Sequence, residues 1–179
     1  MTKSDLRKAI RIRLEALNPE VKARKSAAIC RSVAHTPEWQ TSRVIGFFSP
    51  LPNEPDIDLL WAVLGERTVC YPRVQGDNLI FISVPDREAL LESERWNLME
   101  PPHSDERVMP VEALDFLFVP GIAFTAEGHR MGRGKGYYDR FLVQPGFRAT
   151  ANGVCFAEQF VPHLPMEDHD RPVDRVFSA

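Results

Sequence analysis

Cysteine is scarce in this chain of 179 residues, and the three positions, Cys30, Cys70 and Cys155, are scattered and form no C-x-x-C pair. An odd number of cysteines in apolar surroundings does not suit a disulfide framework. The first residues contain no apolar signal core, and no apolar run approaches the length of a membrane helix. We therefore expect a cytoplasmic protein with reduced, buried thiols.

Neither sign of charge dominates the sequence. The 22 basic and 25 acidic residues leave a net charge of −3, which does not favour nucleic acid or a membrane surface as the main partner. The hydrophobic fraction of 44% and the charged fraction of 26% are ordinary for a soluble globular protein. We expect a single domain over residues 1–179, a monomer whose partners are small molecules.

The common nucleotide-binding fingerprints are also absent. In residues 132–140 three glycines alternate with Arg133 and Lys135, but Gly136 follows the lysine where a Walker A motif needs Ser or Thr. The spacing G-x-G-x-G differs from G-x-G-x-x-G as well. Glycines let backbone N–H groups approach a ligand, and the adjacent cations favour an anion. From the residues alone, this segment is either a phosphate-binding loop or a flexible surface turn.

The residues around this loop favour the first interpretation. Residues 115–119 are an apolar, aromatic run of strand type that ends at Pro120-Gly121. The spacing of Tyr137, Tyr138, Phe141 and Leu142 predicts a helix after the loop. Ligands of open α/β sheets bind at the carboxyl ends of strands, where this loop would lie. Asp139 adds a carboxylate that could hold magnesium on a bound phosphate.

Helices and strands alternate along the chain. Apolar residues at Leu6, Ile10, Leu14 and Leu17 predict an amphipathic helix over residues 3–17, and Asn18-Pro19 begins a second helix that runs to about His35. Shorter helices are expected over 57–64 and 156–161, and strands over 43–48, 68–71, 79–84, 149–156 and 173–177. This order predicts an α/β fold, a single-domain three-layer α/β/α arrangement with a mostly parallel sheet.

Residues 85–112 have no clear period. We expect a short helix and irregular coil there, anchored by Trp96, Leu98 and Met99. Residues 167–170 read Glu-Asp-His-Asp, but side chains adjacent in sequence cannot all face one metal, so no transition-metal site is predicted. Of Phe47 and Phe48, which alternate on one predicted strand, at least one is expected in the core.

Residues 119–124, Gly128, Arg130 and residues 132–140 together resemble the signature of the 5-formyltetrahydrofolate cyclo-ligase family, also called methenyltetrahydrofolate synthetases. The resemblance extends over nearly the whole chain, through residues 3–7, 47–58, 169–170 and 173–176. One departure is visible, because Thr125 stands where the family usually has Asp. The resemblance implies ATP- and magnesium-dependent cyclisation of 5-formyltetrahydrofolate to 5,10-methenyltetrahydrofolate, with release of ADP and phosphate.

The resemblance also implies the site residues. Arg133 and Lys135 are the expected catalytic residues, and Asp139 and Asp174 the expected magnesium ligands. The residues expected to bind ATP are Lys3, Arg7, Arg130, Met131, Gly132, Arg133, Gly134, Lys135, Gly136, Tyr137 and Tyr138. The residues expected to bind the folate are Ser49, Glu54, Arg133, Gly134, Lys135, Gly136 and Tyr137.

Each of these roles has an ordinary alternative. Lys3 and Arg7, one helical turn apart, could form a solvated basic face, and Glu54 could be an exposed loop carboxylate instead of a pterin ligand. Two other functions also fit the sequence. One is a different ATP- or sugar-phosphate-using enzyme on a similar scaffold, and the other is a nucleotide- or folate-binding regulator without catalysis.

Overall fold

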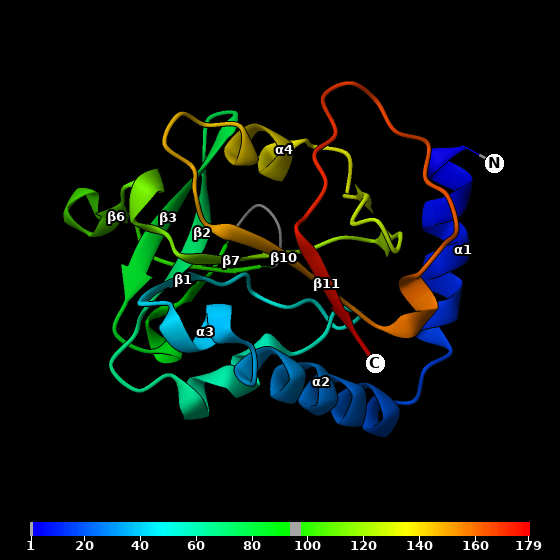
Figure 1. Ribbon diagram of the computed structural model, residues 1–179, viewed down its shortest axis with the longest axis horizontal. Helices are drawn as coiled ribbons and strands as arrows, with labels where there is room; N and C mark the ends of the chain where they lie inside the picture. Colours follow the sequence, from blue (N-terminus) through cyan, green and yellow to red (C-terminus); the bar gives the residue numbers. More distant parts are fainter. Residues whose placement is uncertain (1, 94–97) are drawn as a thin grey trace.

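A seven-stranded sheet with the order β11-β10-β7-β1-β2-β3-β6 forms the centre of the protein (Figure 1). The structure, a computed structural model, describes residues 2–93 and 98–179. The pairs β11–β10, β10–β7, β7–β1 and β1–β2 are parallel, and β2–β3 and β3–β6 are antiparallel. The strands are β1 (Val44–Gly46), β2 (Thr68–Gln75), β3 (Asn78–Val84), β6 (Val108–Met109), β7 (Phe116–Val119), β10 (Thr150–Cys155) and β11 (Arg175–Ser178).

Helices cover both faces of this sheet. In Figure 1, α2 and α3 lie below the sheet, α4 lies above it, and α1 stands at one side. The expected three-layer α/β/α architecture with a mostly parallel sheet is therefore confirmed. The helices are α1 (Lys3–Glu15), α2 (Pro19–Ala34), α3 (Pro37–Thr41) and α4 (Tyr137–Leu142).

Shorter elements connect these parts. Two small antiparallel pairs are β4 (Leu91–Glu92) with β5 (Met99–Glu100) and β8 (Ala123–Phe124) with β9 (Arg130–Met131). The 3₁₀ helices are η1 (Ile57–Val63), η2 (Arg87–Ala89), η3 (Asp105–Arg107), η4 (Val111–Ala113) and η5 (Ala157–Gln159). The expected helix over 57–64 is thus a 3₁₀ helix, and the expected anchor Trp96 lies outside the described residues.

Local capping explains where the first helices begin. The Thr2 side chain accepts a hydrogen bond from the backbone N–H of Asp5, and the Asp5 carboxylate accepts one from Thr2 in return, which makes a capping box. Asn18 caps α2 by accepting from the N–H of Glu20, and Pro19 follows at the first helical position. Both helix starts agree with the sequence pattern.

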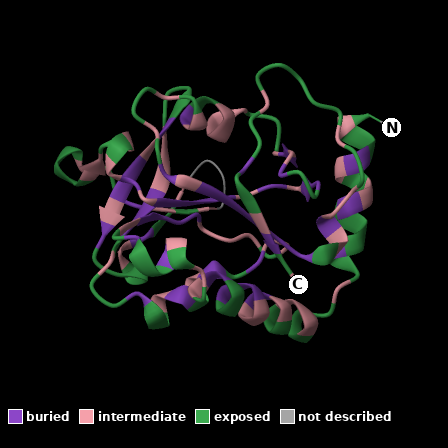
Figure 2. Cartoon of the chain, viewed as in Figure 1, coloured by how far each residue is buried: buried purple, intermediate pink, exposed green. Residues whose placement is uncertain are grey.

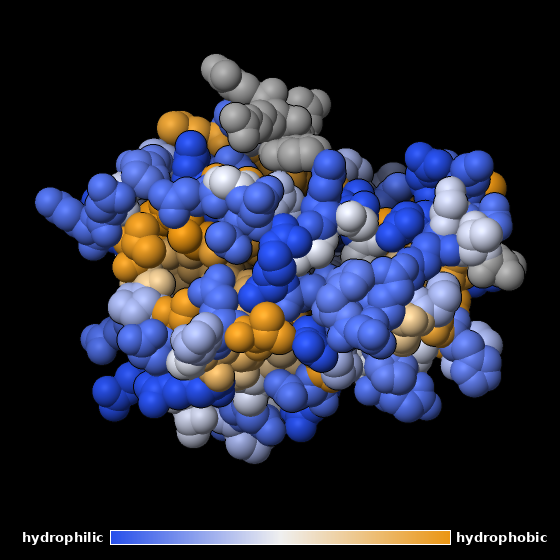
Figure 3. All heavy atoms as spheres, turned by 90° about the horizontal axis from the view of Figure 1, so that it is seen from above, coloured by the Kyte–Doolittle hydropathy of each residue, from blue (hydrophilic) through white to orange (hydrophobic). Residues whose placement is uncertain are grey.

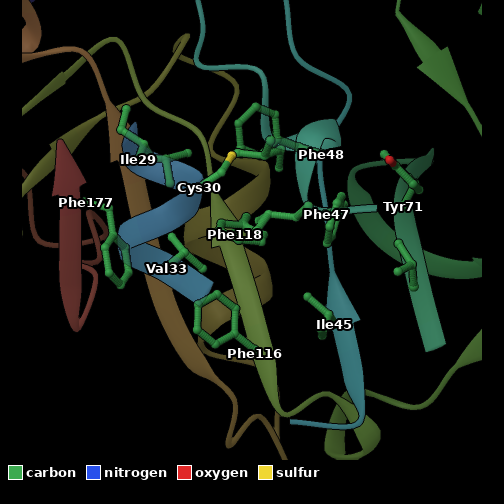
Figure 4. Close-up of a cluster of buried hydrophobic side chains, with 14 of the residues drawn as sticks. Ile29, Cys30, Val33, Ile45, Phe47, Phe48, Tyr71, Phe116, Phe118 and Phe177 are labelled. Atoms are coloured by element: carbon green, nitrogen blue, oxygen red, sulfur yellow. The ribbon is translucent and has the colours of Figure 1, made fainter. Parts of the chain in front are cut away.

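Strand β7 runs through the middle of the core and is buried on both faces, as parallel strands usually are (Figure 2). Phe116 and Phe118 face α2, and Phe118 meets Phe47 edge-to-face with ring centroids 5.3 Å apart (Figure 4). Leu117 and Val119 face the opposite side, in the cluster that includes Phe141 of α4. The alternating aromatic run therefore fixes the strand between two helical layers.

The three cysteines are free and buried, as expected. Burial raises the pKa of the Cys30 thiol to about 12 and that of Cys155 to about 12, so both thiols stay protonated and unreactive near neutral pH. Within residues 2–93 and 98–179, no helix is long and apolar enough to cross a membrane.

Candidate active site

One large pocket opens beyond the carboxyl ends of β1 and β7, where Ser49 and Gly121 line it. Its volume is about 550 Å³, which is in the usual range for a small-molecule site. Its lining combines apolar side chains with many charged ones. The apolar residues of this main pocket are Phe48, Leu51, Pro72, Val74, Leu79, Leu98, Met99, Pro120, Met131, Tyr137 and Tyr138. The charged ones are Lys3, Arg7, Glu54, Glu100, Arg130, Arg133, Lys135, Asp139, Glu167 and Asp170.

The glycine loop forms one wall of the main pocket. Gly134 and Gly136 have φ of 94° and 65°, a left-handed conformation that glycine adopts without strain. Gly136 is the N-cap of α4 and has no side chain to cover the first N–H groups of the helix. Because α4 has only six residues, the bare N–H groups matter here more than a helix dipole.

A buried arginine stands behind this loop. Arg130, on β9, is only 4% exposed, and its Nη2 donates to Oδ1 of Asp139 at 2.7 Å. Its Nε has no hydrogen-bond partner in the described part of the chain. Burial lowers the pKa of Arg130 and the Asp139 charge opposes that shift, so the guanidinium keeps its proton at neutral pH. A buried cation with a spare donor in a pocket wall favours an anionic ligand.

Helix α1 brings two more cations to the same place. Arg7 Nε donates to the backbone oxygen of Gly132 at 3.2 Å, so α1 docks directly on the glycine loop. Lys3 Nζ lies 2.8 Å from Asp170 and 3.3 Å from Glu167, both in the segment before β11. Burial works to lower the pKa of Lys3, but the two carboxylates outweigh it and leave that pKa raised.

Glu54 also lines the main pocket, and its carboxylate is held at both oxygens. Its Oε1 accepts from Arg133 Nη2 at 2.8 Å and its Oε2 from the N–H of Leu51 at 3.0 Å, and its side chain is 8% exposed. The alternative interpretation of Glu54, an exposed loop carboxylate, is therefore wrong, because the carboxylate is largely buried and its oxygens are fixed. Phe47 is in the core, and Phe48 lines the main pocket beside Ser49.

The two expected magnesium ligands lie in different surroundings. Asp139 lines the main pocket, and its Oδ2 has no hydrogen bond in the described part of the chain, so one carboxylate oxygen is available for a cation. Asp174 does not line this pocket, and its Oδ2 accepts from the N–H of Ala151 at 2.7 Å. Among residues 2–93 and 98–179, no group of three His, Cys, Asp or Glu side chains could hold a metal alone.

A single carboxylate nevertheless suits magnesium that arrives with a nucleotide. Such an ion usually takes one or two protein carboxylates and completes its shell with phosphate oxygens and water. Asp139 provides that donor chemistry beside Arg130 and the glycine loop. The placement of Asp174 gives no such support, so its role as a ligand stays a prediction.

The two tyrosines after the loop differ in their surroundings. The guanidinium of Arg140 stacks over the ring of Tyr137 at 5.2 Å. The hydroxyl of Tyr138 is buried and has no hydrogen-bond partner in the described part of the chain, and burial raises its pKa. Both tyrosines are half-buried, and the buried hydroxyl of Tyr138 suits a packing role.

The unusual Thr125 does not disturb the hairpin before the glycine loop. Its N–H donates to His129 O at 2.9 Å, and its carbonyl accepts from Gly128 N at 3.2 Å. Gly128 has a φ of 86°, so the turn between β8 and β9 closes through backbone bonds and a left-handed glycine. The replacement therefore leaves the path into the loop intact.

The structure brings the predicted site residues together, with Asp174 as the exception. Sequence reasoning assigned no site role to several residues that line the same pocket: Pro72, Val74, Leu79, Leu98, Met99, Glu100, Glu167, His169 and Asp170. For Asp170, the available signal was its place in a short acidic run near the end of the chain.

The model of the 5-formyltetrahydrofolate cyclo-ligase family matches residues 1–179. The chain belongs to this family. Among curated members, the 5-formyltetrahydrofolate cyclo-ligase of Mus musculus is 31% identical over 97% of this chain and 92% of its own. The enzyme of the same name from Escherichia coli K12 is 32% identical over 93% of this chain and 94% of its own.

Solved structures of the family agree with the fold. The 5,10-methenyltetrahydrofolate synthetase of Aquifex aeolicus superposes with a TM-score of 0.86 at 32% identity, and the match covers 99% of this chain and 90% of that one. The synthetase of Mycoplasma pneumoniae has a TM-score of 0.77 at 24% identity and covers 99% and 98%, which supports the fold alone.

Proposed function

We propose that this cyclo-ligase family member converts 5-formyltetrahydrofolate to 5,10-methenyltetrahydrofolate and splits ATP into ADP and phosphate. The observation that carries the proposal is that one pocket combines the glycine loop and its cations with apolar side chains and Glu54. The glycine loop and cations suit a triphosphate, and the apolar side chains with Glu54 suit a flat, partly polar ring. Both ligands would then meet at Arg133 and Gly134.

The chemistry explains why a phosphate site and a ring site must adjoin. The formyl group on N5 is amide-like, so its carbon is a poor electrophile and its oxygen a poor leaving group. Transfer of the γ-phosphoryl group of ATP to the formyl oxygen corrects both and releases ADP. N10 then attacks the formyl carbon, loses its proton, and the C–O bond breaks to release phosphate.

The residues of this chain would position the reactants and balance charge, which is most of what phosphoryl transfer requires. The backbone N–H groups of the glycine loop, together with Lys3, Arg7 and Arg130, would hold the phosphates. Arg133 and Lys135 would face the oxygen to which the phosphoryl group moves. No protein nucleophile is needed, because both attacking atoms belong to the folate.

Glu54 would orient the pterin. Its oxygens are fixed by Arg133 and by the N–H of Leu51, so the carboxylate is held in place before the folate arrives. Ring N–H groups are suitable donors to such a carboxylate. Preorganisation of this kind lowers the entropic cost of binding.

Magnesium bound with ATP would neutralise phosphate charge, and Asp139 would be its protein ligand, with Asp174 as the second predicted one. Asp174 could serve only if its carboxylate reached the main pocket, which it does not line. We also propose that the enzyme is monomeric and cytoplasmic. Its buried free thiols support the cytoplasmic location.

The direct test is to mix the protein with 5-formyltetrahydrofolate and Mg-ATP and to record the near-ultraviolet absorbance of the methenyl product. We expect product and ADP to appear in equal amounts. ADP that forms without folate, or with a sugar phosphate in its place, would indicate a different ATP-using enzyme. Binding of both ligands without turnover would indicate a regulator.

A further inference from the structure

Helix α2 binds the backbone of the loop that carries Glu54. This loop, residues 49–56, lies between β1 and η1, and we call it the Glu54 loop. The hydroxyl of Ser26 accepts a hydrogen bond from the N–H of Asp56 at 3.0 Å. The thiol of Cys30 donates to the carbonyl of Asp56, with 3.4 Å between sulfur and oxygen. Both backbone groups of the residue two positions after Glu54 are therefore bound to one helix.

A third side chain of α2 reaches the other side of Glu54. Lys22 Nζ donates to Oδ1 of Asn53 at 2.8 Å. Lys22, Ser26 and Cys30 are four residues apart, so they lie one above another on the same face of α2. Three successive helical turns thus hold the Glu54 loop on both sides of Glu54, which restricts where its carboxylate can lie.

Ser26 is the unusual member of this face. It is 2% exposed, and the other buried residues of α2 are Ile29, Cys30 and Val33. Figure 4 shows these three among the side chains of the core. Serine is less favourable than alanine inside a helix, and a buried hydroxyl is costly unless it is hydrogen-bonded. The bond to Asp56 is therefore what the hydroxyl contributes at this position.

The glycine loop holds Glu54 from the opposite side of the sheet, but through a more exposed contact. The side chain of Arg133, which donates to Glu54 Oε1, is 56% exposed. Figure 3 views the molecule from above, on the α4 side, and the surface toward α1 is mostly hydrophilic in this view. Ion pairs exposed to water contribute little, because water and salt compete for both partners. The buried bond from Ser26 is therefore the firmer hold on the Glu54 loop.

We propose that Ser26 is a positioning residue for Glu54, and through Glu54 for the pterin of the folate. Its bond to Asp56 keeps the Glu54 loop where the carboxylate enters the main pocket, and Lys22 acts in the same way through Asn53. Neither Ser26 nor Lys22 lines the main pocket, so neither would touch the folate. This inference rests on the proposed function, because the place of Glu54 affects turnover only if the folate binds there.

The test measures the KM for the folate and for ATP in Ser26→Ala, with Ser42→Ala as the matched control. Ser42 is also buried, at 7% exposure, but its hydroxyl donates to the backbone of Glu38 in α3, outside the Glu54 loop. Loss of one hydrogen bond in Ser26→Ala should raise the folate KM roughly two- to tenfold and leave the ATP KM within about twofold. Ser42→Ala should leave both KM values unchanged.

Lys22→Met is a second variant, which keeps most of the side-chain stem and removes only the donor to Asn53. It is half-buried, so the fold should tolerate the change, and the folate KM alone should rise. A rise in the ATP KM that equals the rise in the folate KM, in either variant, would overturn the proposal.

A double-mutant cycle separates positioning of Glu54 from a general structural role. Because Ser26 acts through Glu54, Ser26→Ala should change the folate kcat/KM by less than about twofold when Glu54→Ala is already present. The same factor in both backgrounds would contradict the proposal.

Turnover by the wild-type protein decides which claim fails. If it forms the methenyl product and Ser26→Ala keeps the wild-type folate KM, the positioning inference fails while the proposed function stands. If it forms no product, calorimetric titration with 5-formyltetrahydrofolate gives the same comparison as a ratio of Kd values. Absence of folate binding in that titration would contradict both the proposed function and the positioning role of Ser26.

Discussion

Replacement of Asp139 by Asn should destabilise the protein strongly, whatever the role of Asp139 in catalysis. Arg130 is 4% exposed and the Asp139 side chain 14% exposed, and the two charges meet at 2.7 Å. Removing one partner of a buried ion pair leaves the other charge buried and uncompensated, at a cost of about 3–5 kcal/mol. Asn keeps a side-chain acceptor for Arg130 and for the N–H of Arg171, so we expect Asp139→Asn to lower the free energy of unfolding by about 2–4 kcal/mol.

That loss is large enough to measure by thermal unfolding. For a domain of this size, each kcal/mol shifts Tm by about 2–4 °C, so Asp139→Asn should lower Tm by roughly 4–16 °C. Arg130→Met alone should also destabilise, but the double variant should recover part of the loss, because it removes both charges together. Asp174→Asn is the control, since this exposed carboxylate holds one backbone N–H, and it should cost only about 1 kcal/mol.

The reasoning would be refuted if Asp139→Asn unfolded within about 1 °C of wild type, or if the effects of Asp139→Asn and Arg130→Met were additive. The result also affects the test of the magnesium site. Turnover of Asp139→Asn must be followed against magnesium concentration well below its own Tm. Under those conditions, loss of a magnesium ligand raises the magnesium concentration needed for turnover, whereas loss of a purely structural residue does not.

Three further changes test other parts of the site. Gly134→Val should raise the ATP KM at least about tenfold while Tm falls by only a few degrees, because a branched side chain is strained at a φ of 94°. Normal ATP kinetics in this variant would show that the loop is only a surface turn. Glu54→Gln should raise the folate KM roughly 10- to 100-fold through loss of a charged acceptor, and an equal effect on ATP would contradict a pterin role. Burial works to raise the pKa of Asp170, but the hydrogen bond from Lys3 outweighs it, so the pKa is lowered. The ion pair therefore stabilises the fold fully above the unfolded pKa of about 3.9, and this stabilisation is lost as the pH falls further. The Tm gap between wild type and Asp170→Asn should therefore shrink in unfolding curves below about pH 4, and a gap that is independent of pH would contradict this coupling.

Sequence patterns predicted the local elements well because each is encoded in a few neighbouring residues. The strand at β7 follows from an apolar run, and the starts of α1 and α2 from the caps Thr2 and Asn18. The glycine loop and the helix after it follow from one stretch of nine residues. The family resemblance placed Arg7 and the glycine loop in one ATP site, and the bond from Arg7 to Gly132 agrees with this.

Residue patterns alone did not predict the contacts between distant segments. Lys3 and Asp170 are separated by 167 positions, and Glu54 and Arg133 by 79, so no periodicity links them. Part of the apolar lining of the main pocket comes from β2, β3 and the β5 region, whose residues read as ordinary strand residues. For Asp174 the motif is present, but the register of β10 with β11 sets its carboxylate against Ala151, so its role as a magnesium ligand stays a prediction.

The central claim is that ATP activates the formyl oxygen of the folate inside the main pocket. The most direct measurement uses 5-formyltetrahydrofolate with ¹⁸O in the formyl group, unlabelled Mg-ATP and unlabelled water, and mass analysis of the phosphate released with the methenyl product. The account predicts that each phosphate carries one ¹⁸O atom from the formyl group. Phosphate without label, formed together with methenyltetrahydrofolate, would show that the formyl oxygen leaves without phosphorylation and would contradict the account.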